Sequence, residues 1–104
     1  MLSFKLGSQP HMSWAMAAAL LAVERILGTR GVPMVITAGV DGTHMEHSKH
    51  YDGLAFDCRS HDLPVNERSR VLVEMQRALG TAYDVLLEGA GTDHEHYHVE
   101  YDPR

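Results

Sequence analysis

Histidine side chains gather in two segments of this chain. Eight of its 104 residues are histidine. Six of them form two groups: His44, His47 and His50, and His94, His96 and His98. Histidine is the commonest metal ligand and the side chain that most readily exchanges protons near neutral pH. The two groups therefore point to a metal site or to acid–base chemistry.

Three residues have the types and spacing of a catalytic zinc site: His50, Asp57 and His98. Such a site needs three protein ligands, for which histidine nitrogen and carboxylate oxygen are suitable, and one open position. A turn at Gly53 allows His50 and Asp57 to meet, and His98 on a neighbouring strand completes the set. Asp57 lies in an apolar strand, where an unpaired carboxylate is costly. We therefore expect Asp57 to meet the metal, with Arg59 as the alternative cation.

A carboxylate beside the open position would act as the catalytic base. Glu95 lies three residues before His98 and is expected to reach that position around a turn, with Glu88 as the second candidate. Four further residues are expected to contact substrate or to support the ligands: Ser48, Arg59, His96 and Glu100. Glu100 would either orient a ligand histidine or pair with an arginine.

The sequence pattern predicts an α+β domain. Apolar residues recur at helical spacing in residues 12–28, capped by Ser13, and in residues 66–79, ended by Gly80. Four short segments are typical of strands: 34–38, 54–58, 83–88 and 97–101. This order predicts a small antiparallel sheet of about four strands, with both helices on one face. Alternation in the last strand places His98 and Glu100 on the same side.

The first predicted helix carries two apolar stripes. The first consists of Met16, Leu20, Val23 and Leu27. The neighbouring stripe consists of Trp14, Ala17, Ala18 and Leu21. We expect both stripes to pack in the core.

Charge and composition exclude several classes of protein. The net charge is −5 with neutral histidine, and no basic stripe is present to bind nucleic acid. One cysteine, Cys58, excludes an internal disulfide. The longest apolar run, residues 15–23, is shorter than the roughly 18 residues of a membrane span. The N-terminus lacks the features of a signal peptide, and we expect one domain over residues 1–104.

The two histidine-containing segments together resemble the zinc D-Ala-D-Ala carboxypeptidase and dipeptidase family, which includes phage L-alanyl-D-glutamate endopeptidases. The family pattern Ser-x-His-x-x-Gly-x-Ala-x-Asp is matched in full by Ser48, His50, Gly53, Ala55 and Asp57. A later acidic residue, a histidine and a further glutamate are matched by Glu95, His98 and Glu100. The resemblance covers roughly residues 33–101.

The resemblance implies the Hedgehog/DD-peptidase fold and one zinc ion held by His50, Asp57 and His98, with Glu95 as the base. The implied reaction is hydrolysis of a peptidoglycan stem-peptide bond, of the D-Ala-D-Ala carboxypeptidase or L-Ala-D-Glu endopeptidase type. We expect a monomeric catalytic domain without a separate wall-binding domain, membrane insertion or nucleic-acid partner. The expected setting is a phage or prophage enzyme made in the cytoplasm, which acts on the cell wall after release.

One feature of the family is missing. Members often carry an oxyanion-stabilising arginine after the first strand, where this chain has Ala38-Gly39-Val40-Asp41. Oxyanion stabilisation is often the largest catalytic contribution, so another donor is expected. The candidates are His44, His47, Lys49 and Arg59, of which His44 has the best position. The missing arginine favours the alternative function, a non-catalytic zinc-binding interaction module of the same fold, whereas Glu95 favours the enzyme. A metal-dependent nuclease is a weaker alternative that the acidic charge opposes.

Overall fold

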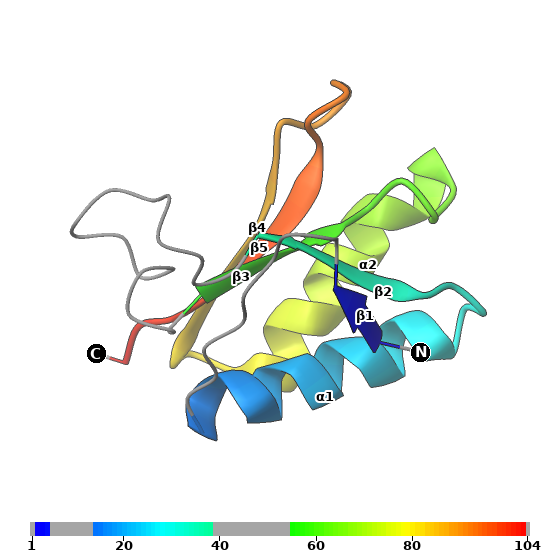
Figure 1. Ribbon diagram of the computed structural model, residues 1–104. Coiled ribbons are helices and arrows are strands. Elements are labelled where there is room, and N and C mark those ends of the chain that lie inside the picture. Colours follow the sequence, from blue (N-terminus) through cyan, green and yellow to red (C-terminus); the bar gives the residue numbers. More distant parts are fainter. Residues whose placement is uncertain (1, 5–13, 39–54, 104) are drawn as a thin grey trace.

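The computed structural model describes residues 2–4, 14–38 and 55–103. Its elements are β1 (Leu2–Phe4), α1 (Trp14–Gly28), β2 (Met34–Ala38), β3 (Ala55–Arg59), α2 (Val65–Leu79), β4 (Tyr83–Glu88) and β5 (His96–Tyr101). Both helices lie against the same face of the sheet (Figure 1). This arrangement confirms the predicted α+β class, and within the described ranges no helix is long and apolar enough to cross a membrane.

The sheet has the strand order β1-β2-β3-β5-β4. Strands β2, β3, β5 and β4 are antiparallel neighbours, which confirms the four predicted antiparallel strands. Strand β1, which was not predicted, pairs in parallel with β2. The order places β5 between β3 and β4, so side chains on β5 have neighbours from both flanking strands.

The core lies between the sheet and the helices. Side chains from α1, α2 and the near face of the sheet are buried there, including Leu20, Val23, Val71, Tyr97 and Val99. Because side chains alternate along a strand, burial of Tyr97 and Val99 directs the intervening residues of β5 to the other face of the sheet. That face carries the polar side chains of β5.

The second apolar stripe of α1 does not pack as predicted. Trp14 is 87% exposed and Leu21 is 66% exposed. A helix in a two-layer domain buries a single apolar stripe, and the stripe that contains Leu20 and Val23 occupies the contact with the core. The prediction of core packing is therefore wrong for Trp14, Ala18 and Leu21, which are all exposed.

The end of α2 follows the prediction closely. Gly80 adopts a positive φ of 79°, and its N–H donates to the carbonyl of Gln76. A positive φ favours glycine because it has no Cβ. At the other end the helix begins at Val65, after Pro64, one residue earlier than predicted. An ion pair between Arg30 and both Glu67 and Glu74 joins the residues that follow α1 to α2.

Candidate functional site

The face of the sheet opposite the helices brings together two of the predicted ligands, Asp57 and His98, and the second candidate base, Glu88, from three neighbouring strands. The register pairs Asp57 of β3 with His98 of β5, and Glu88 of β4 with His96 of β5. Side chains directly opposite each other on antiparallel strands have Cβ atoms about 5 Å apart. Sheet pairing alone therefore places two predicted zinc ligands side by side, although they lie 41 positions apart in the sequence.

Asp57 and His98 form a close pair. His98 Nδ1 lies 2.7 Å from Asp57 Oδ1, and the side chains are 15% and 16% exposed respectively. The other ring nitrogen of His98, Nε2, lies 3.1 Å from Glu100 Oε1. Hydrogen bonding to Asp57 raises the pKa of His98 to about 9, burial acts in the opposite direction, and Glu100 adds to the increase. The surroundings of the His98 ring thus favour positive charge.

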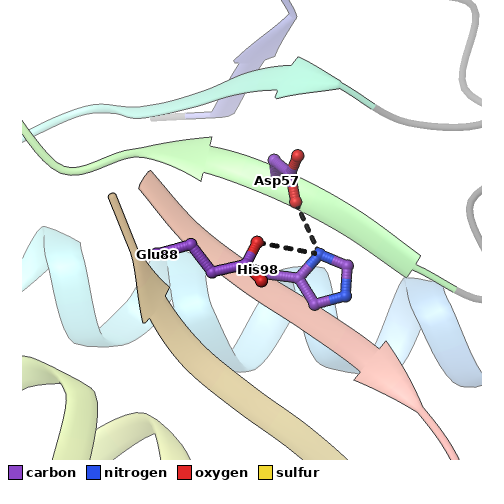
Figure 2. A group of neighbouring side chains, drawn as sticks. All are labelled: Asp57, Glu88 and His98. Atoms are coloured by element: carbon purple, nitrogen blue, oxygen red, sulfur yellow. Dashed lines mark hydrogen bonds and ion pairs between the residues drawn. The ribbon is translucent and has the colours of Figure 1, made fainter. Parts of the chain in front are cut away.

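Glu88 reaches the same position from β4, as Figure 2 shows. Its Oε1 lies 3.9 Å from His98 Nδ1 and 3.0 Å from His96 Nε2. One potential ligand atom each from Asp57, Glu88 and His98 lies within 4.8 Å of the other two. Unlike Asp57, Glu88 has a side chain that is 46% exposed, so its carboxylate is accessible to water or substrate.

His96 supports Glu88 from the neighbouring position on β5. Its Nδ1 lies 2.6 Å from the carbonyl oxygen of His94, and a carbonyl oxygen only accepts, so Nδ1 carries the hydrogen. The other ring nitrogen, Nε2, lies next to the Glu88 carboxylate and 3.7 Å from Asp57 Oδ2. Burial lowers the pKa of His96, but the His94 carbonyl and the two carboxylates raise it more, so its pKa lies above the ordinary value.

The donors present fit a zinc ion. Carboxylate oxygen and imidazole nitrogen are common zinc donors, and at bonds of about 2.0 Å two tetrahedral ligand atoms lie about 3.3 Å apart. Asp57 Oδ1 and His98 Nδ1 are 2.7 Å apart, so a separation of roughly half an ångström would convert their hydrogen bond into a shared metal contact. The spacing of Asp57 and His98 is therefore compatible with a shared zinc ion, and their roles as ligands stay predictions.

Glu95 has a different environment. It is 7% exposed, and its Oε1 accepts hydrogen bonds from Ser60 Oγ at 2.6 Å and from Arg68 Nη1 at 2.8 Å. Its Oε2 accepts the backbone N–H of Gly91 at 3.1 Å. Glu95 borders the same hollow as Asp57, but its carboxylate is engaged with α2 and the turn before β5. Its role as the base stays a prediction.

The network around Glu95 is expected to stabilise the fold. Arg68→Ala would leave the Glu95 carboxylate buried without its cation, and loss of one partner of a buried pair costs about 3 kcal/mol or more. We expect urea unfolding, measured with a chelator present, to show a loss of about that size. Arg70→Ala, an exposed position on the same helix, serves as the matched control and should change stability by less than about 0.5 kcal/mol. Equal losses in the two variants would contradict a special role for the Arg68–Glu95 pair.

The same network predicts a pH dependence of stability. Burial raises the pKa of Glu95, but the hydrogen bonds from Ser60 and Gly91 and the charge of Arg68 outweigh burial, so its pKa lies below its ordinary value. A carboxyl group whose pKa is lower in the folded state stabilises the fold above its unfolded pKa, and this stabilisation is lost as pH falls through the folded pKa. We expect the difference in unfolding free energy between wild type and Glu95→Gln to be constant above about pH 6 and to shrink below about pH 4. A difference that grows on acidification would exclude this explanation.

Among the described residues, Arg59 forms its ion pair with Asp62 and not with Asp57. Its Nε lies 2.8 Å from Asp62 Oδ2, and β-sheet register places it opposite His96. The alternative pairing of Asp57 with Arg59 is therefore wrong, because Asp57 pairs with His98 and Arg59 with Asp62.

Several predicted site residues lie outside the described residues. These are the third ligand His50, the oxyanion candidates His44, His47 and Lys49, and Ser48. Their roles stay predictions. Glu100, in contrast, lies in β5, and its Oε1 lies 3.1 Å from His98 Nε2. Whether it orients a metal ligand stays a prediction.

The sequence comparisons do not identify a family. A scan against protein-family models gives no match, and a search of curated proteins gives none either. The relationship to the zinc carboxypeptidases and endopeptidases therefore stays a prediction from the residues described above.

Proposed function

We propose that this protein is a zinc-dependent peptidase that hydrolyses a stem-peptide bond of peptidoglycan. The observation that carries the proposal is the Asp57–His98 pair, with Nδ1 and Oδ1 2.7 Å apart and the Glu88 carboxylate 3.9 Å from the same nitrogen. The Ser-x-His-x-x-Gly-x-Ala-x-Asp pattern of residues 48–57 supports the same family and fold. The proposed setting is a phage or prophage enzyme that reaches the cell wall after release.

In this proposal Asp57 and His98 hold the zinc together with His50. When bound, zinc supplies Lewis-acid chemistry, which polarises a peptide carbonyl and acidifies water. Glu100 contacts His98 Nε2, and such a contact fixes the tautomer and orientation of a ligand ring. A carboxylate base takes a proton from the attacking water and returns it to the leaving amine as the carbon–nitrogen bond breaks.

We assign the role of base to Glu88 rather than Glu95. A general base needs a lone pair directed at the reacting water. Three hydrogen bonds occupy the Glu95 carboxylate, and its lowered pKa makes it a weaker base. The Glu88 carboxylate is 46% exposed and borders the Asp57–His98 pair. Its contact with His96 at 3.0 Å positions it there.

Digestion of purified peptidoglycan by the zinc-loaded protein, with mass spectrometry of the fragments, tests the function. Released D-alanine would establish a carboxypeptidase, and new L-alanine and D-glutamate ends would establish an endopeptidase. One bound zinc per chain without any cleavage would instead favour the non-catalytic zinc-binding module, and a chain that binds no zinc would contradict both. A chelator-treated sample is the control, and its activity should return when zinc is added.

A further inference from the structure

An open hollow of about 430 Å³ lies beside the Asp57–His98 pair. It is formed by β2, β3 and the turn that leads into β5, and its lining includes Asp57, Arg59, Asp93 and His96. The hollow thus extends from a proposed zinc ligand along β3 to a permanently charged arginine. A substrate held at the zinc site would place neighbouring groups in this hollow.

Arg59 is held in a position to receive an anion. Its Nε is bonded to Asp62 Oδ2 at 2.8 Å, its side chain is 42% exposed, and among described residues this is its one ion pair. The two terminal nitrogens of the guanidinium therefore remain for another partner. The planar guanidinium binds carboxylates through two parallel hydrogen bonds, so Arg59 is suited to a second carboxylate at those nitrogens.

The spacing along β3 sets where this carboxylate would lie. Arg59 follows Asp57 by two residues, so both side chains emerge on one face with Cα atoms about 6.8 Å apart. In a peptide, the α-carboxyl carbon of the residue after the scissile bond lies about 3 to 4 Å from the scissile carbonyl carbon. An extended arginine side chain covers the remaining separation.

We propose that Arg59 binds the free α-carboxylate of the residue that follows the scissile bond. This inference rests on the proposed function. Both candidate bonds meet the requirement: the last D-alanine of a stem peptide has a free carboxylate, and D-glutamate keeps its α-carboxylate free because the chain continues through its γ-carboxyl group. The substrate class is therefore a peptide with an anionic group directly after the cleaved bond.

Asp93 makes the preference for an anionic substrate depend on Arg59. Its carboxylate lines the same hollow and repels an entering anion, whereas the charge of Arg59 attracts it. Removal of the Arg59 charge leaves the repulsion in place, so the preference for an anionic substrate should disappear and not merely weaken.

Paired substrates test the inference. Diacetyl-L-Lys-D-Ala-D-Ala, and L-Ala-D-Glu with its γ-carboxyl group blocked as an amide, are each compared with the peptide in which the α-carboxyl group is also amidated. A charge-assisted hydrogen bond gives roughly a 10- to 100-fold preference, so wild type should cleave the acid form of its substrate with a kcat/KM higher by that factor. Arg59→Gln should lower kcat/KM for the acid form to that of the amide, mainly through KM, and change the amide less than about threefold. Arg59→Lys should keep part of the preference.

Arg77→Gln, an exposed position at the far end of α2, is the matched charge control and should behave as wild type. If Arg59→Gln keeps the preference, or loses activity equally toward acid and amide, the inference is overturned while the peptidase proposal stands. If wild type cleaves both forms equally, the inference fails in the same way. If wild type cleaves none of the four peptides or peptidoglycan itself, the proposed function fails and this inference with it.

Discussion

Replacement of Glu88 by glutamine is expected to lower kcat for the stem peptide by about a thousandfold, within the 10²- to 10⁴-fold range typical of a general base. Glutamine keeps the size of the side chain but cannot take a proton from water. The zinc content of Glu88→Gln should stay near that of wild type, because Asp57 and His98 are unchanged. Steady-state kinetics and metal analysis on the same preparation measure both quantities.

Glu95→Gln is the matched comparison, since it makes the same chemical change on the carboxylate that the family resemblance implies as the base. We expect this variant to keep kcat within about tenfold of wild type and to lose stability, because its carboxylate is bonded to Arg68 and Ser60. A folded, zinc-loaded Glu95→Gln without activity, alongside an active Glu88→Gln, would reverse the two assignments.

Asp57→Ala is expected to reduce stabilisation by zinc by at least about a third. A ligand that binds the folded protein stabilises it by about 4 kcal/mol at a thousandfold excess over its dissociation constant. The melting temperature of wild type should therefore rise when zinc is added. Loss of the carboxylate removes one of the three proposed ligands. Loss of a group that only supports a ligand lowers metal affinity roughly 10- to 100-fold, so we expect zinc affinity to fall by at least that factor. Thermal unfolding with and without zinc measures the effect.

Asp84→Ala is the control for removal of a carboxylate near the site. Asp84 lies on β4 opposite Glu100, and together with Glu100 and Asp102 it forms a second group of clustered carboxylates. The zinc-dependent rise in melting temperature should persist in this variant. If Asp84→Ala removes the rise and Asp57→Ala keeps it, zinc binds at the second group and the proposed ligands are wrong.

The fold could largely be predicted because its elements have strong local patterns. The bounds of β2 and β4 agree with the predicted segments 34–38 and 83–88, since each is a short apolar or alternating run between turn residues. Strand β1 could not be predicted, because it has three residues and depends on parallel pairing with β2, about 30 positions away. Nothing in its local sequence specifies such a partner.

The site could be predicted in part. Alternation along two strands was sufficient to place Asp57 and His98 on one face. The position of Glu88 depends on the register of β4 with β5, and residues 89–95 between these strands are too many to set that register as a two-residue hairpin turn would. Glu95 directly precedes β5, which begins at His96 instead of the predicted Tyr97.

The partners of Glu95 had a weaker sequence signal. A carboxylate that is buried needs a cation or several donors, and Arg68 on α2 and Ser60 after β3 supply them. Neither residue belongs to the histidine-containing segments. The pairing of β3 with β5, which sets Arg59 opposite His96, brings Ser60 to Glu95, and the packing of α2 against the sheet brings Arg68. Burial of Glu95 could therefore not be deduced from its spacing to His98.

The most direct test of the central claim is crystal diffraction from the zinc-loaded protein above and below the zinc absorption edge. We expect one strong anomalous peak on the face of the sheet opposite the helices, about 2.0 to 2.2 Å from an Asp57 oxygen and a His98 nitrogen. The Glu88 carboxylate should lie next to that peak without occupying every remaining position around the metal. A peak among Asp84, Glu100 and Asp102, or the absence of any peak in crystals grown with zinc, would contradict the proposed zinc site.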